Sequence, residues 1–184
     1  MGERFCGIGR INRMIDLSSL LNYAPDTAIN KTERVVEEAR ARGDQTAFLS
    51  HSHTDAVYAK RVQAFLEAQG WRVYIDWEDA SMPSKPDKET ARKIKDRIKR
   101  LDWFLFLATK NSMSSRWCPW EIGIADGVKA NERIIVIPTR DGYINYGSEY
   151  LDLYRYIHST TVGGFATFDA GQTQNGTVLR NMRR

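Results

Sequence analysis

Hydrophobic positions between residues 44 and 137 follow two alternating patterns. Short runs that are apolar on both faces alternate with longer segments in which apolar residues recur at helical spacing. The apolar runs are Thr46–Leu49, Arg72–Ile75, Trp103–Ala108 and Arg133–Ile137. Strands of a parallel sheet that is covered on both faces meet no water, so they are apolar throughout. The pattern therefore predicts a doubly wound α/β fold, a parallel sheet with helices on both faces.

Three predicted helices connect these strands. The first two are indicated by apolar stripes at Ala56, Ala59, Val62 and Phe65 and at Ala91, Ile94, Ile98 and Leu101. Gly70 separates the first helix from the strand that follows it. The third helix begins near Trp117, beside a proline, and extends to about Ala130. We expect Trp120 of this helix to pack into the core.

Residues 1–43 are predicted to form a helical extension. Its first short amphipathic helix is indicated by Met14, Leu17, Leu20 and Leu21. A capping box at Asn30–Glu33 predicts a second helix, which ends at Gly43. We expect residues 44–158 to form the main domain and residues 159–184 to be a C-terminal strand or tail packed on it.

Composition limits the classes of function. The chain has 184 residues, of which 42% are hydrophobic and 27% charged, as is typical of one globular domain with appendages. Its apolar runs are far shorter than the roughly 18 to 20 residues that span a bilayer, so we expect no membrane partner. Residues 1–6 are not followed by the continuous apolar segment of a secretory signal, so we expect a cytoplasmic protein. The formal net charge is only +4, and the basic residues of segment 87–100 fit a solvated helix face. We therefore expect no nucleic-acid partner.

Metal and thiol chemistry are not indicated. Cys6 and Cys118 are far apart and lack metal-ligand spacing, which predicts neither a disulfide framework nor a zinc site. His51 and His53 are too few for a closed metal site, and neither His53 nor His158 has a partner that the sequence identifies. We expect Cys118 to be a buried, inert thiol.

Polar residues follow each predicted strand at its carboxyl end. In doubly wound sheets ligands bind outside these ends, where helix N-termini also point. The groups that we expect to converge there are Ser50–His53, Asp76–Asp79, Thr109–Ser112 and Glu121. This edge of the sheet is the predicted functional site.

Three familiar chemistries do not fit this edge. A receiver domain needs an acidic pair after its first strand and an Asp after its third, whereas this chain has His and Ser, then Thr and Lys. Neither glycine-rich phosphate-binding motif follows the first strand. A hydrolase triad of Ser50, His51 and Asp76 would lack the nucleophile elbow that presents a serine.

Three motifs in order resemble the TIR (Toll/interleukin-1 receptor) domain. Phe48–Asp55, with the sequence FLSHSHTD, resembles the first signature box of the family, and Val73–Glu78 resembles the second strand and its loop. Residues 79–86 stand where the mobile BB loop of the family lies. Trp117–Glu121 matches the W-x-x-x-E pattern of NAD-cleaving TIR domains. The resemblance, which covers about residues 44–158, implies a flavodoxin-like fold and is greatest to bacterial TIR enzymes of the Thoeris antiphage type.

The resemblance implies an NAD⁺ glycohydrolase or ADP-ribosyl cyclase that makes a cyclic ADP-ribose isomer, ADP-ribose or both. Glu121 would be the catalytic carboxylate, kept ionised by its early helical position, and Trp117 would form a wall of the site. The other expected substrate contacts are Ser50, His51, Asp76 and Trp77. The residues alone leave open whether Ser50 is a simple strand-end residue and His51 a solvated histidine. They also leave open whether Asp76 instead caps a loop and Trp77 packs beneath it.

The implied partners follow from the same resemblance. NAD⁺ would be the substrate, no separate cofactor or metal would be needed, and the cyclic product would diffuse to a separate effector in antiphage defence. Self-association would use contacts near residues 79–86. The alternative is a non-catalytic TIR adaptor that acts by association with other TIR domains. Such an adaptor does not require an acid at position 121, so the presence of Glu121 favours the enzyme.

Overall fold

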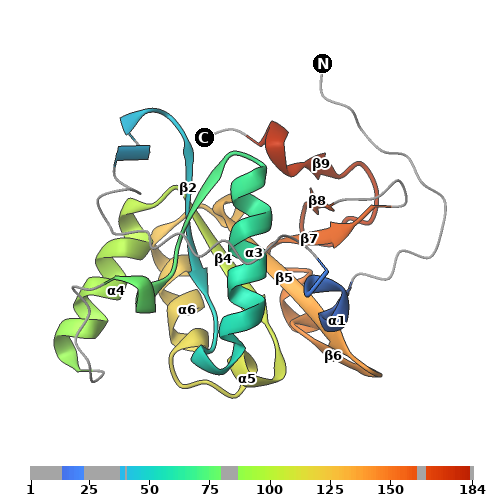
Figure 1. Ribbon diagram of the computed structural model, residues 1–184, viewed down its shortest axis with the longest axis horizontal. Helices are drawn as coiled ribbons and strands as arrows, with labels where there is room; N and C mark the ends of the chain where they lie inside the picture. Colours follow the sequence, from blue (N-terminus) through green and yellow to red (C-terminus); the bar gives the residue numbers. More distant parts are fainter. Residues whose placement is uncertain (1–13, 23–37, 40, 80–86, 161–164, 183–184) are drawn as a thin grey trace.

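A single mixed sheet forms the centre of the protein (Figure 1). The computed structural model describes residues 14–22, 38–39, 41–79, 87–160 and 165–182. Within this part of the chain the strands are β1 Ile15–Asp16, β2 Gln45–Ser50, β3 Trp71–Tyr74, β4 Trp103–Ala108, β5 Ile134–Asp141, β6 Ile144–Tyr146, β7 Arg155–Ser159, β8 Phe165–Phe168 and β9 Thr177–Val178. Their order is β3-β2-β4-β5-β7-β8-β9, with β1 and β6 both paired to β5.

Five neighbouring strands form the parallel part of the sheet. β3, β2, β4, β5 and β7 are parallel to one another, and their order along the chain is the 2-1-3-4-5 order of flavodoxin-like folds. The predicted fold class is therefore confirmed. Antiparallel strands extend it: β8 pairs with β7, β9 pairs with β8, and β6 forms a hairpin with β5.

Helices cover both faces of this sheet. The α-helices that the structure describes with both ends are α1 Leu17–Leu20, α3 Ala56–Ala68, α4 Lys88–Arg100, α5 Lys110–Met113 and α6 Cys118–Val128. The 3-10 turns are η1 His53–Asp55, η2 Asp76–Glu78, η3 Asn131–Arg133, η4 Ser148–Tyr150 and η5 Leu179–Asn181. α1 and α3 pack on one face of the sheet, and α4 and α6 on the other (Figure 1).

Two apolar clusters fill the spaces between these layers. One joins Ile94 and Ile98 of α4 and Ile122 of α6 to strand residues such as Phe48 and Phe104. The other joins α3 and α1 to the strand residues that point to the opposite face of the sheet. These are Ala47, Leu49, Val73, Leu105, Leu107, Ile135 and Ile137. Successive strand residues point to opposite faces, so each strand contributes to both clusters. This explains why the strands are apolar throughout.

The N-terminal segment differs from its prediction. Apolar spacing from Met14 to Leu21 predicted one helix, but Ile15 and Asp16 are extended and pair with Thr139 and Arg140 of β5. The helix α1 begins only after Asp16, whose carboxylate accepts a 3.0 Å hydrogen bond from the backbone N–H of Ser18. The strand pairing and this cap leave room for a single helical turn.

The second predicted N-terminal helix is described only in part. Residues 38, 39 and 41 are helical, whereas the predicted capping box at residues 30–33 lies outside the described residues. The proposed domain limits at residues 43 and 158 stay predictions. No helix in the described part of the chain is long and apolar enough to cross a membrane.

Candidate functional site

The carboxyl ends of β2 and β4 form the topological switch point of the sheet. β2 lies between β3 and β4 in the sheet. The chain therefore runs from β2 to its neighbour β3 on one side and then crosses to β4 on the other side. The helices that follow β2 and β4 lie on opposite faces of the sheet, and in doubly wound folds ligands bind at such a point. Ser50 ends β2, and the loop after β4 leads through α5 to α6, which carries Glu121.

Glu121 is held at this point by Ser50. The Ser50 hydroxyl donates a 2.6 Å hydrogen bond to Oε2 of Glu121. Trp117 is the N-cap of α6, Pro119 occupies its first turn, and the Glu121 N–H donates to the Trp117 carbonyl at 2.8 Å. The Glu121 side chain is only 5% exposed and Ser50 is fully buried. The structure thus brings together the first box and the W-x-x-x-E motif.

The ionisation of Glu121 differs from its prediction. Its place in the first turn of α6 predicted a stabilised anion, but burial raises the pKa of Glu121 to about 7. The Ser50 hydrogen bond and the nearby His53 lower this pKa, whereas the charge of Asp76 raises it further. Desolvation outweighs the dipole because a helix N-terminus contributes only about 0.3 to 1 kcal/mol at an exposed site. Glu121 therefore titrates near neutral pH.

Asp76 pairs with a histidine that sequence reasoning left without a partner. His53 begins η1, and its Nε2 lies 3.4 Å from Oδ2 of Asp76, the first residue of η2. Burial opposes ionisation of Asp76, yet the pKa of Asp76 is lowered on balance by the hydrogen bond and the charge of His53. The hydrogen bond to Asp76 raises the pKa of His53. The only sequence signal for this pair was the position of both residues at strand ends.

His51 is buried beside Trp77. Its Nδ1 lies 2.9 Å from the Leu49 carbonyl, and its ring meets the Trp77 ring edge-on with centroids 4.3 Å apart. Burial lowers the pKa of His51, so the ring is neutral near pH 7. A carbonyl accepts only from an N–H, so the proton is on Nδ1 and Nε2 carries a lone pair. Among the described residues Nε2 has no hydrogen-bond partner.

The tryptophans of α6 lie at the edge of the core. Trp117 and Trp120 are half-buried, pack against the α6 side of the sheet, and meet edge-on with centroids 5.2 Å apart. Trp120 was expected to pack into the core, but it is only partly buried and packs against the edge of the core. Cys118 is buried as expected, and burial raises the pKa of its thiol to about 11, which favours an unreactive thiol. A substrate contact by Trp117 stays a prediction.

Asp55 ties the two loops of the switch point together, which the sequence did not reveal. Its carboxylate accepts hydrogen bonds from the Thr109 hydroxyl and, at 2.7 Å, from the Asn111 side-chain amide. Asp55 is buried although it carries a charged group. The segment after β2 is therefore fixed against the segment after β4, which keeps Ser50 and α6 in register.

Two anchors hold η2 in place. Glu78 forms an ion pair with Lys60 of α3 and accepts a 3.0 Å hydrogen bond from the Gln63 amide. On the opposite side Asp79 accepts a 2.7 Å hydrogen bond from Tyr74 and pairs with Arg97 of α4 at 3.4 Å. Asp76 and Trp77 are thus positioned from both faces of the sheet. The predicted association segment is residues 79–86, of which residues 80–86 lie outside the described residues.

Comparison with known proteins identifies the family. A family model described as TIR domain matches residues 47–166. The chain belongs to the TIR domain family. It is also 34% identical over 140 residues to a Bacillus cereus (strain MSX-D12) protein named "Probable 3' cyclic ADP-D-ribose synthase ThsB'", an alignment that covers 71% of each chain. The resemblance based on three motifs is confirmed.

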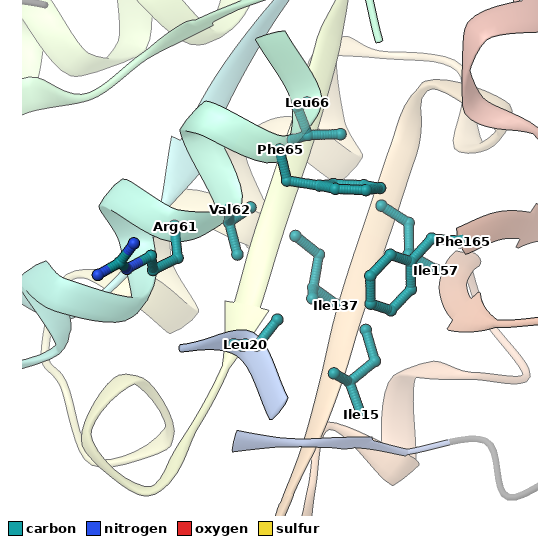
Figure 2. Close-up of a pocket in the computed structure, with 9 residues that line it drawn as sticks. All are labelled: Ile15, Leu20, Arg61, Val62, Phe65, Leu66, Ile137, Ile157 and Phe165. Carbon is teal, nitrogen blue, oxygen red and sulfur yellow. The ribbon is translucent and has the colours of Figure 1, made fainter. Parts of the chain in front are cut away.

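The TIR domain also contains a hollow far from this chemistry. Figure 2 shows it between α3, the N-terminal segment and strands β5, β7 and β8, with apolar side chains around it and Arg61 extending away. Its volume is about 20 Å³, room for roughly one water molecule. A hollow of this volume cannot admit a dinucleotide, so it is not the substrate site.

In the described residues no group of three or more His, Cys, Asp or Glu side chains could hold a metal ion.

Proposed function

We propose that this TIR domain cleaves the nicotinamide–ribose bond of NAD⁺ and captures the ribosyl cation as a cyclic ADP-ribose isomer. The observation that carries this proposal is the buried Glu121 carboxylate, held by Ser50 at the switch point where doubly wound folds bind ligands. The similarity to a protein named as a cyclic ADP-ribose synthase supports the same chemistry and a cyclic product.

One carboxylate is enough for this reaction. The nicotinamide of NAD⁺ is a cation in the substrate and leaves as a neutral pyridine, so it needs no general acid. Ordinary glycoside hydrolysis, in contrast, uses a second carboxyl group to protonate the departing oxygen. Ionised Glu121 stabilises the positive charge that develops on the ribose, and its burial strengthens that interaction by excluding water. Ser50 holds the carboxylate in place and favours its charged form.

The neighbouring groups fit the rest of the substrate. Trp117 and Trp77 offer aromatic surfaces for the ribose, nicotinamide or adenine. The free lone pair of His51 Nε2 can accept a hydrogen bond from a substrate N–H or O–H, and Asp76 can do the same. NAD⁺ is the substrate in this scheme, and no separate cofactor or metal is needed.

The biological role that we propose is signalling in bacterial antiphage defence. The cyclic product would diffuse to a separate effector, and assembly through residues 79–86 would close the site of one copy with the loop of another. Intramolecular capture can outcompete water because a well-placed hydroxyl reaches an effective concentration of about 10⁵ M or more. Trp77 and Trp117 would hold such a folded-back substrate by stacking and would exclude water from the cation.

Incubation of the purified protein with NAD⁺ in ¹⁸O-labelled water tests the proposal. Chromatography and mass analysis should give nicotinamide and an unlabelled ribose product with the mass of a cyclic isomer, with or without EDTA. A product that is entirely labelled linear ADP-ribose would overturn the cyclase. Absence of nicotinamide release at any protein concentration would instead favour the adaptor, and loss of activity with EDTA that a divalent ion restores would contradict metal independence.

A further inference from the structure

The His53–Asp76 pair lies at the same edge as Glu121 but has no part in the departure of nicotinamide. His53 follows Ser50 closely along the chain, and Asp76 follows β3, so the pair joins the ends of two adjacent strands. The His53 side chain is 71% exposed, whereas that of Asp76 is 21% exposed. The pair therefore places a titratable group at the rim of the site, in contact with solvent.

Asp76 defines which nitrogen of His53 is available. Oδ2 of Asp76 lies 3.4 Å from Nε2, so in the neutral ring the proton is on Nε2 and the lone pair is on Nδ1. The Trp77 ring stands edge-on to the His53 ring at 5.8 Å between centroids, and the His51 ring lies at 6.1 Å. A carboxylate that fixes the tautomer of an imidazole is the arrangement that general bases use.

The charged groups around His53 come from two elements. Asp76 of η2 and Glu121 of α6 both favour its protonated form, and His51, which directly follows β2, is neutral and adds no charge. The interaction with Glu121 is mutual, since His53 lowers the pKa of Glu121. The charge of each group therefore influences the protonation of the other.

Cyclisation requires a proton acceptor that cleavage does not. When nicotinamide leaves, it takes the electron pair of the glycosidic C–N bond, and a hydroxyl of the adenosine ribose then donates a lone pair to form a C–O bond. The O–H bond of that hydroxyl must break, so the ring closure releases one proton. Water that attacks instead can lose its proton to neighbouring water, but a hydroxyl packed against protein has no such route.

Neither Glu121 nor His51 fits this task as well. Glu121 faces the cation and is bound to Ser50, and His51 is buried, with no exposed path along which to release a proton. We propose that His53 Nδ1, oriented by Asp76, accepts the proton of the attacking ribose hydroxyl and passes it to solvent, so that His53 commits the ribosyl cation to the cyclic product. This inference rests on the proposed NAD⁺ cleavage and deepens it.

A pair of variants tests this role. His53→Gln removes the base, and Thr54→Ala is the matched control, an exposed residue in the same turn. Nicotinamide release reports cleavage, and the ratio of cyclic to linear product reports capture. We expect His53→Gln to lower this ratio by at least about tenfold, since general bases contribute about 10² to 10⁴-fold. Because His53 also lowers the pKa of Glu121, which is about 7, the proteins are compared at a pH well above that value, where Glu121 is ionised in all of them. Thr54→Ala should match the wild type in nicotinamide release and in the ratio of cyclic to linear product.

The outcomes separate this inference from the proposed function. If the wild type releases nicotinamide and His53→Gln gives the same product ratio, the role of His53 is wrong while NAD⁺ cleavage stands. If the wild type makes linear product alone, the inference also fails. A wild type that releases no nicotinamide overturns both. Both variants should fold, since both positions are exposed, and matching thermal unfolding curves check this.

The pH dependence of the product ratio gives a second, independent readout. The neutral ring accepts the proton, so the cyclic fraction of the wild type should rise as the pH passes through the pKa of His53, which Asp76 raises. Asp76→Asn should move this rise to lower pH, and His53→Gln should abolish it. A wild-type ratio that is independent of pH would count against His53 as the acceptor.

Discussion

Ser50 and Glu121 lie 71 positions apart in the sequence and share a buried 2.6 Å hydrogen bond. It joins the carboxyl end of β2 to the first turn of α6, the two elements that border the switch point of the sheet. A hydrogen bond from a neutral hydroxyl to a carboxylate favours the charged form. Ser50 therefore controls how much of the Glu121 carboxylate is ionised at neutral pH.

Ser50→Ala should move the pH dependence of NAD⁺ cleavage. Without the hydroxyl the pKa of Glu121 rises above its value of about 7, because burial then acts with less opposition. Hydrogen bonds to charged groups contribute about 1.5 to 3 kcal/mol, so the acidic limb of kcat/KM should shift upward by at least about one pH unit. Ser114→Ala, at an exposed position, is the control. If the acidic limbs of the wild type, Ser50→Ala and Ser114→Ala were superimposable, Ser50 would not control the ionisation of Glu121.

Glu121→Gln should abolish most of the activity. The substitution keeps the size of the side chain and removes its charge, so NAD⁺ cleavage should fall by about 10² to 10³-fold if electrostatic stabilisation dominates. Single-turnover nicotinamide release measures this directly. Near-normal release from a variant that is fully folded would rule out Glu121 as the catalytic group.

The same substitution should stabilise the protein at alkaline pH. The folded pKa of Glu121 is raised above its unfolded value, so the folded state binds the proton more tightly between about pH 4.5 and 7. The wild type should therefore lose stability as the pH rises through this window, by roughly 3 kcal/mol in all, and then level off. Glu121→Gln has no ionisable group at this position, so its free energy of unfolding should not fall in this way. Urea unfolding of both proteins at pH 5 and 8 gives the comparison, and an equal pH dependence would contradict burial of the ionised carboxyl.

The parallel strands and the W-x-x-x-E site could be predicted because their signals are local. β4 was predicted with its observed limits, Trp103–Ala108, since six successive apolar residues fit only an element buried on both faces. Glu121 was placed at the carboxyl edge because its helix starts soon after that strand. Both inferences need only the order of elements along the chain.

Other features depend on contacts that no local pattern encodes. β1 has two residues, too few to show a period, and the neighbouring leucines fit a helix equally well. The His53–Asp76 contact joins side chains of separate loops, so its geometry depends on rotamers. The raised pKa of Glu121 was missed for the same reason: helix position is a local property, whereas desolvation depends on everything packed around the carboxyl.

Activity should depend on assembly if residues 79–86 help to close a neighbouring site. We expect NAD⁺ turnover to rise faster than linearly with protein concentration, since dimer formation follows mass action. Specific activity and sedimentation should be measured together across about a hundredfold range of concentration. Constant specific activity in a protein that stays monomeric would exclude this mechanism.

Gly147→Ala should destabilise the carboxyl end of β4. Gly147 has φ +84°, and a Cβ there would lie 2.5 Å from Cβ of Ala108, the last residue of that strand. Gly142→Ala is the matched control, because Gly142 has φ +58° with no atom within 4 Å of an added Cβ. Both variants carry the left-handed cost of about 1 to 2 kcal/mol, and Gly147→Ala adds about 1 to 3 kcal/mol for the overlap. If urea unfolding gave equal losses of unfolding free energy for the two variants, the end of β4 would be able to shift and accommodate the added methyl group.

Arg97→Met should be far more costly than the same change on the exposed face of α4. The Arg97 guanidinium is buried 3.4 Å from the Asp79 carboxylate and lies over the Tyr74 ring, so its removal leaves a buried charge with less compensation. Breaking such a pair costs about 3 to 5 kcal/mol. Arg92→Met removes exposed ion pairs to Glu89 and Asp96 and should cost at most about 1 kcal/mol. Adding Asp79→Asn to Arg97→Met should recover part of the lost stability, because the buried charge is then removed. Equal unfolding free energies for the two single variants, or no recovery in the double variant, would show that this ion pair does not anchor η2.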